Sequence, residues 1–265
     1  MIKLPAIFAL AVFSILLFGC TQTSPDNTPK GSYFEIVREG KALGDLGSKE
    51  YLLTGEGLLL RKIKVEFSGR PPLPTDISIW RIPKENAVPL MLQVRGETKS
   101  VFEECDNCAT YHLFYGDSTG IKVFEAPEYK TPKFITDLPG RMEDIIKTAA
   151  REETFFASMV YSKRGIIYDY HIFGDGTVIY EEFGYSPATM ANAKVQRMNT
   201  GQFFTTIPDA FFEEKDSGNG CNRDGFDYGY VEIAKGEKTN FIFTCGNGQN
   251  PSDLVFNQLM NLVEK

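Results

Sequence analysis

The sequence predicts an α+β protein in which an N-terminal all-β domain precedes an α+β domain of antiparallel hairpins and short helices. Two observations carry this prediction. Residues 31–130 alternate apolar and charged side chains with a period of two, and no helical period is evident there. Residues 134–265 combine strong turn sequences with apolar side chains at helical spacing. A chain of 265 residues is long enough for one large or two ordinary domains.

The all-β domain is predicted from several short alternating segments. Residues 58–67 (LLLRKIKVEF) begin apolar and then alternate, which is typical of a strand with one solvated, charged face. Residues 77–82 (ISIWRI) alternate likewise, and residues 90–94 continue the strand pattern. A sandwich or barrel is the simplest architecture for these segments.

The α+β domain is predicted from two hairpins and three helices. The first hairpin, residues 168–180, turns at Gly174-Asp175-Gly176, and the second, residues 226–243, turns near Gly236. Helices are expected over residues 140–150, from Thr200, and after Asn250-Pro251-Ser252. The last of them carries one apolar stripe, formed by Val255, Leu259, Leu262 and Val263.

A degenerate hairpin–helix repeat is a further hypothesis. Tyr111-His112-Leu113-Phe114 reappears as Tyr170-His171-Ile172-Phe173, 59 residues later, and a predicted helix follows each segment. The alternative is coincidence, because Tyr, Phe and Gly-Asp are common in hairpins.

The N-terminus predicts export and lipidation. Residues 4–18 are almost wholly apolar and end before Gly19-Cys20. The run is shorter than the ~20 residues of a spanning helix. Residues 1–19 therefore resemble a lipoprotein signal peptide, with Cys20 as the lipidated residue and residues 20–30 as a polar, flexible tether. An uncleaved anchor helix is the alternative, and it also places the chain outside the cytoplasm.

Location and charge limit the partners. We expect the protein at the cell membrane, held by its lipid anchor and facing away from the cytoplasm. The net charge is −7, and no Lys/Arg block stands out, so no nucleic-acid partner is expected. Another envelope protein is the expected partner besides the membrane itself.

Four cysteines follow Cys20, and an even number in an exported chain predicts disulfides. We predict the pairs Cys105–Cys108 and Cys221–Cys245. Cys105-Asp-Asn-Cys108 has redox spacing, but its flanks are strand-like rather than helical. A redox pair, a four-cysteine zinc site and cross-pairing between the two groups remain as alternatives.

No constellation of catalytic residues stands out. The chain has two histidines, His112 and His171, each within a predicted strand, and both are interpreted as partly exposed strand residues rather than a functional pair. No Gly-x-Ser-x-Gly, His-Glu-x-x-His or phosphate-binding glycine-rich sequence is present.

Residues 216–227 form the most polar stretch, and no cofactor is expected except, as an alternative, calcium. An EF-type loop centred on Gly225 would start at Gly220 and end at Val231, so its strongest ligands are absent. The candidate calcium ligands are Asp216, Asn222, Asp224 and Asp227.

Residues 155–265 resemble a family of uncharacterised domains found in bacterial lipoproteins and secreted proteins. The shared feature is a Tyr-x-x-x-Ile-x-x-Asp-Gly-x-Val-x-Tyr hairpin, which runs here from Tyr168 to Tyr180. Asp224 matches an Asp that the family often has, whereas Arg164-Gly165 stand where the family has Cys-Pro. The resemblance implies a hairpin, a helix, a second hairpin and a final helix, and it implies no activity.

The favoured function is therefore a non-catalytic binding or envelope-assembly module. Tyrosines offer large contact areas with a polar tip, so they are the expected contact surface. An extracytoplasmic hydrolase with unidentified carboxylate residues is the alternative, which a pocket holding two or more carboxylates would favour. The candidate contact residues are Tyr168, Tyr170, Tyr180 and Tyr228.

Overall fold

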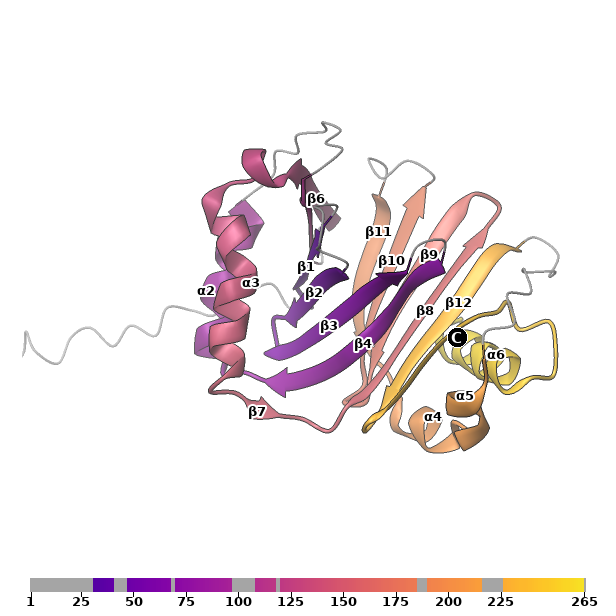
Figure 1. The fold of residues 1–265 in the computed structure, drawn as a ribbon. Coiled ribbons are helices and arrows are strands. Elements are labelled where there is room, and N and C mark those ends of the chain that lie inside the picture. Colours follow the sequence, from indigo (N-terminus) through magenta and orange to yellow (C-terminus); the bar gives the residue numbers. More distant parts are fainter. Residues whose placement is uncertain are drawn as a thin grey trace, which may run out of the picture.

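In a computed structural model, the chain forms two antiparallel sheets that stack face to face, with helices on both outer faces (Figure 1). The result is four layers, in the order helices, sheet, sheet, helices. The predicted α+β class is confirmed at this coarse level, and strands dominate. The structure describes residues 31–40, 47–67, 70–96, 108–117, 120–184, 190–215 and 226–264.

The first sheet has the strand order β6-β5-β1-β2-β3-β4-β7, and each neighbouring pair is antiparallel. Its strands are β1 (Tyr33–Glu39), β2 (Gly47–Thr54), β3 (Leu58–Phe67), β4 (Arg70–Arg81), β5 (Thr110–Asp117), β6 (Gly120–Pro127) and β7 (Ala150–Arg151).

The second sheet has the order β11-β10-β9-β8-β12-β13, again antiparallel throughout. Its strands are β8 (Phe155–Lys163), β9 (Ile166–Phe173), β10 (Thr177–Gly184), β11 (Met190–Arg197), β12 (Phe226–Lys235) and β13 (Lys238–Phe243).

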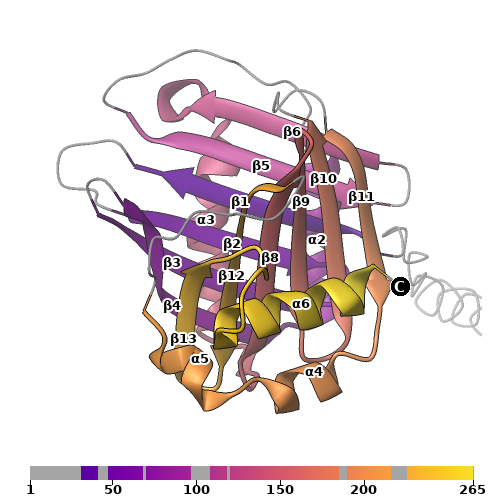
Figure 2. The same cartoon turned by 90° about the vertical axis from the view of Figure 1, so that its right-hand side faces the viewer.

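Helices cover the outer face of each sheet. The first sheet carries α2 (Lys84–Gly96), which follows β4, and α3 (Lys133–Ile146), which a short 3₁₀ turn, η1 (Glu128–Lys130), links to β6. The second sheet carries α4 (Gly201–Thr206), α5 (Asp209–Glu213) and α6 (Pro251–Val263), and α6 lies across its strands (Figure 2). Among the described residues, no helix has the length and apolar character needed to cross a bilayer.

The two halves of the chain share one topology. In the first half, the meander β1–β4 is followed by α2, by the hairpin β5–β6 beside β1, and by α3. In the second half, β8–β11 is followed by α4 and α5, by the hairpin β12–β13 beside β8, and by α6. The repeating unit in the structure is therefore half of the fold, which is longer than the hairpin–helix unit of the hypothesis. Tyr111 lies on β5 and Tyr170 on β9, which are not equivalent strands.

The first half is not all-β, contrary to the prediction. Residues 90–94, read as a strand, belong to α2, whose buried side chains recur at helical spacing. Pro89 obscures this pattern because it lies inside the helix, where a proline has no amide hydrogen to donate to the preceding turn. The buried residues of α2 are Ala87, Leu90, Met91 and Val94.

The predicted boundary near residue 134 is also displaced. The helix expected over residues 140–150 is α3, which begins at Lys133 and packs into the same core as Trp80 of β4. Strand β7 then pairs with β4. Residues 133–151 therefore complete the first half, and the second half begins at β8.

Both predicted hairpins and the last helix are confirmed. The turn between β9 and β10 contains Gly176 at φ +92°, and Asp175 Oδ1 accepts a hydrogen bond from the Thr177 amide at 2.9 Å. A side chain at Gly176 would also meet the Met198 carbonyl oxygen, 2.6 Å from an added Cβ, so only glycine fits. The β12–β13 turn contains Gly236 at φ +63°.

A third core lies between the two sheets. Apolar side chains from β1–β4 meet those of the second sheet there, including Phe156 and Phe173, which are almost fully buried. Because strand side chains alternate, the opposite faces of the same strands pack against the helices. Both faces of both sheets are therefore covered, which decides the environment of the polar side chains.

Candidate functional site

A group of ionisable side chains lies between the sheets, beside this apolar core. We call it the charged centre. Most of its members are less than one-tenth exposed, and Asp169, at its margin, has a side chain that is 22% exposed. The members are Tyr33, Glu35, Glu50 and Lys62 of the first sheet and Asp169, His171, Glu181 and Glu232 of the second.

Strand register assembles the centre. Glu50 and Lys62 are directly opposite on β2 and β3, and Asp169 and Glu181 are opposite on β9 and β10. Side chains opposite each other in an antiparallel pair point to the same face. Glu35 follows Tyr33 by two residues on β1 and therefore shares its face.

Lys62 joins the two sheets through buried ion pairs. Its Nζ lies 2.6 Å from Glu50 Oε1 of its own sheet and 3.2 Å from Glu232 Oε2 of the other sheet. Burial alone would lower the pKa of Lys62, but the charges of Glu232 and Glu50 outweigh it and raise the pKa. Lys62 therefore stays protonated and pairs with both carboxylates.

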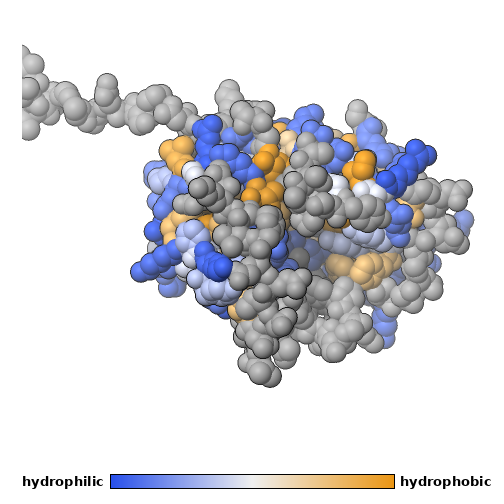
Figure 3. All heavy atoms as spheres, turned by 90° about the horizontal axis from the view of Figure 1, so that it is seen from above, coloured by the Kyte–Doolittle hydropathy of each residue, from blue (hydrophilic) through white to orange (hydrophobic). Residues whose placement is uncertain are grey.

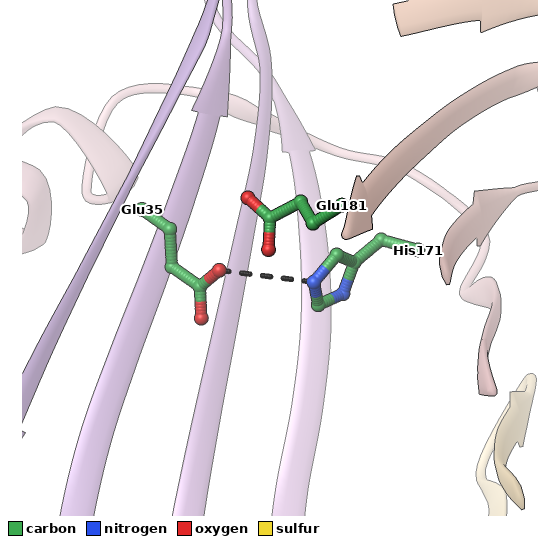
Figure 4. Close-up of side chains that lie close together, drawn as sticks. All are labelled: Glu35, His171 and Glu181. Carbon is green, nitrogen blue, oxygen red and sulfur yellow. Dashed lines mark ion pairs between the residues drawn. The ribbon is translucent and has the colours of Figure 1, made fainter. Parts of the chain in front are cut away.

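Three further side chains converge beside this pair (Figure 4). Glu35 comes from the first sheet, and His171 and Glu181 come from the second. One donor atom from each lies within 4.8 Å of the other two. His171 Nε2 is 3.7 Å from Glu35 Oε2 and 3.6 Å from Asp169 Oδ1. The Tyr33 hydroxyl donates a short hydrogen bond to Glu181 Oε1, which fixes that carboxylate.

The centre holds more acidic than basic groups. In the part of the chain that the structure describes, Lys62 pairs directly with Glu50 and Glu232, whereas Glu35 and Asp169 lie closest to His171. Burial, followed by the charges of neighbouring carboxylates, raises the pKa of Glu35 well above its usual range. Burial and the charge of Asp169 raise the pKa of Glu181 to about 8. Buried negative charge is costly, so this group requires protons or a cation.

The histidines differ in their surroundings. His171 is 3% exposed, so its predicted partial exposure is wrong, because the first sheet covers the face on which it lies. His112 of β5 is partly exposed, and its ring nitrogens lie 3.6 Å from Glu39 and 3.7 Å from Glu125. The two histidines belong to different sheets and to different sites.

Four tyrosines form a stacked row on the outer face of β8, β9 and β10. Ring centroids of Tyr161 and Tyr168 are 4.9 Å apart, and those of Tyr170 and Tyr180 are 5.0 Å apart. Tyr161 and Tyr170 are buried, whereas Tyr168 and Tyr180 are half-buried. We call Tyr161, Tyr168, Tyr170 and Tyr180 the tyrosine row.

The fourth predicted contact residue, Tyr228, lies on β12 and is 36% exposed. The structure thus brings three of the four predicted tyrosines together, Tyr168, Tyr170 and Tyr180. Tyr161 was not among the predicted contact residues. It stacks against Tyr168 and contacts Phe256 of α6. Its outward position follows from the alternation along β8.

Several predicted sites fall largely outside the described residues. These include Cys20, Cys105 and Cys221, and three of the candidate calcium ligands, Asp216, Asn222 and Asp224. Cys108 and Cys245 are each disulfide-bonded. The predicted pairs, Cys105–Cys108 and Cys221–Cys245, stay a prediction.

The fourth candidate calcium ligand, Asp227, lies at the start of β12 and is engaged by the β8–β9 turn. Its Oδ2 accepts hydrogen bonds from Ser162 Oγ at 2.9 Å and from the Gly165 amide at 3.4 Å. This carboxylate oxygen therefore stabilises the turn.

A cavity of about 270 Å³ opens where β4, β7 and the β9–β10 turn meet. Three carboxylates line it, those of Glu152, Glu153 and Asp175. Arg81 pairs with Glu152 at 3.4 Å and with Asp175 at 3.1 Å. Although burial opposes it, hydrogen bonds from Thr177 and Arg81 lower the pKa of Asp175. Glu152 and Asp175, which pair with Arg81, are suited to closing the edge between the sheets rather than to transferring protons.

The end of the sandwich is largely polar. Figure 3 shows hydrophilic residues over most of the described part of this face, with hydrophobic residues in small groups between them.

No protein-family model matches the chain, and comparisons with curated proteins and with solved structures give no match either. The family resemblance of residues 155–265 stays a prediction.

Proposed function

We propose that the protein is a membrane-anchored, extracytoplasmic binding module that contacts another envelope protein through the tyrosine row. The observation that carries this proposal is the packing of the Tyr168 and Tyr180 rings against each other and against the buried rings of Tyr161 and Tyr170. Rings held by their neighbours lose little conformational entropy on binding, and Tyr supplies apolar area with a polar tip.

The positions of the acidic side chains favour binding over hydrolysis. In the charged centre, carboxylates lie between two packed sheets, where a substrate would have to displace the core. In the edge cavity, Arg81 pairs with Glu152 and Asp175. A general acid and base need access to the reacting atoms and proton affinities near neutrality. The hydrolase alternative has less support from these residues than the binding module has from the tyrosine row.

Replacing Tyr168 with Ala is expected to weaken capture of the partner by about tenfold, because truncating a central aromatic contact typically costs more than 1 kcal/mol. The measurement is capture of envelope proteins from native membranes by the purified chain, with quantification of the protein that wild type enriches. Tyr168→Phe keeps the ring and should retain most of the capture.

Tyr129→Ala is the matched control for this experiment. Tyr129 is 61% exposed and lies on η1, which belongs to the first half of the fold. Equal capture by wild type and by a folded Tyr168→Ala variant would contradict the proposal, as would an equal loss with Tyr129→Ala.

Replacing Cys20 with Ala is expected to release the protein from membranes or to leave it with its signal peptide attached. A thioether-linked lipid needs the Cys20 thiol, and a lipid chain adds about 0.8 kcal/mol of membrane affinity per buried methylene. Fractionation of cells and the mass of the mature chain measure both outcomes. A processed Cys20→Ala chain that stays membrane-bound as firmly as wild type would refute lipid anchoring.

A further inference from the structure

We propose that Glu35, His171 and Glu181 form a binding site for one divalent transition-metal ion, which joins the two sheets. This inference goes beyond the proposed function and does not depend on it. The three residues come from β1, β9 and β10, so an ion bound by all three would link both halves of the fold.

The donor atoms are close to the spacing that a metal requires. Zinc binds imidazole nitrogen and carboxylate oxygen at about 2.0–2.2 Å, so tetrahedral ligands lie about 3.4 Å from one another. His171 Nε2 and Glu35 Oε2 are 3.7 Å apart, and all three donors lie within 4.8 Å. Side-chain shifts of about 1 Å are enough to complete the site, without any change in strand register.

Asp169 offers a fourth donor at the margin of the site. Its Oδ1 lies 3.6 Å from His171 Nε2, and this buried oxygen accepts no hydrogen bond from the residues that the structure describes. The Asp169 side chain is 22% exposed, so it connects the buried site with solvent. An ion or its last water ligand can therefore reach the centre along this side.

The excess of carboxylates in the charged centre favours a cation between Glu35, His171 and Glu181. Lys62 pairs directly with Glu50 and Glu232, and among the described residues Glu35, Glu181 and Asp169 lie around the imidazole of His171. A divalent ion supplies two positive charges at the point where Glu35 and Glu181 converge.

The donor set selects the class of ion. Imidazole with two carboxylates suits zinc, manganese and iron(II), whereas calcium takes six to eight oxygen ligands. The Tyr33 hydroxyl donates a hydrogen bond to the carboxylate of Glu181. Metal-binding carboxylates are commonly held in place by such a hydrogen bond from a neighbouring side chain. Zinc is the appropriate probe because it has no redox chemistry and accepts these ligands readily.

The chain contains its own matched control. His112 also lies between two carboxylates, Glu39 at 3.6 Å and Glu125 at 3.7 Å. These side chains are 22%, 50% and 29% exposed, and all three come from the first sheet. Water and ordinary ion pairing satisfy such a surface group, so it should not retain an ion.

The test uses the mature full chain after metal stripping. We expect dialysis against zinc to leave one ion per chain. The melting temperature should rise by about 5–10 °C when free zinc is about 100 times its Kd. His171→Gln and Glu181→Gln should each weaken zinc binding by more than tenfold, whereas His112→Gln should bind as wild type does. Calcium at the same concentration should leave the melting temperature unchanged.

If the ligand variants fail to fold, the imidazole resonances of the wild-type chain provide a second test of the site. The wild-type chain has two histidines, and His112→Gln assigns their imidazole resonances. Cobalt(II) at one equivalent should shift or broaden the signals of His171 and leave those of His112 sharp. Effects confined to His112, or no retained zinc in the folded wild-type chain, would overturn the proposal.

Discussion

Replacing Lys62 with Met is expected to lower the free energy of unfolding by about 3–5 kcal/mol. The ammonium group is 2% exposed and is the cation shared by Glu50 and Glu232. Its removal leaves two carboxylates desolvated between the sheets, and Met restores apolar volume without restoring charge. Urea unfolding at pH 7 measures the loss.

Two further variants separate charge from packing. The triple variant Lys62→Met, Glu50→Gln, Glu232→Gln removes the charges together and should recover most of the lost stability, because isosteric replacement of a whole buried ion group is often neutral. Lys84→Met is the surface control, since Lys84 and Glu56 are both about half exposed and pair at 3.1 Å. It should change stability by less than about 1 kcal/mol. A loss with Lys62→Met no larger than this control would contradict the buried ion pairs.

Replacing Phe156 with Ala is expected to cost about 3–5 kcal/mol and to destabilise both halves of the fold together. Phe156 belongs to the second sheet, is fully buried, and contacts Phe173 with ring centroids 5.4 Å apart. Its cluster includes Leu58, Leu60, Ile77 and Ile79 of the first sheet. The cavity left by the ring therefore weakens the contact between the sheets.

The fluorescence of the single tryptophan provides a separate measurement of unfolding in the first half of the fold. Trp80 lies in the first sheet, on the side packed against the helices, so its fluorescence reports on the first half. Circular dichroism reports on both sheets. We expect the two signals to show one shared transition, shifted equally by Phe156→Ala. An unchanged Trp80 transition, with an earlier loss of circular dichroism, would show that the halves unfold independently, as two domains.

Local features of the fold were predictable because their causes are local. The β9–β10 turn needs a residue that accepts positive φ, and Gly176 supplies it. The last helix has its proline at the start and its apolar stripe at helical spacing. Helix α2 was not predicted, because the apolar residues in a window as short as 90–94 fit the period of a strand and the period of a helix equally well.

The candidate metal site was not predictable in this way. Its ligands lie at positions 35, 171 and 181, so no short spacing connects Glu35 with the other two. On β9, His171 alternates with Tyr170 and Ile172, and alternation distinguishes two faces of a strand without saying what covers each face. The polar face was read as the solvated one, which is the usual case for an antiparallel sheet.

The sequence by itself determined the turns, most of the strands and the final helix, because each depends on neighbouring residues. Tertiary structure alone decided that the faces of the two sheets that carry the residues of the charged centre pack against each other, beside an apolar core. The helices cover one apolar face of each sheet, so the remaining faces, which carry Lys62 and His171, are buried against each other. Only this stacking turns ordinary charged strand positions into a buried, ion-paired centre, because desolvation makes their mutual interactions strong.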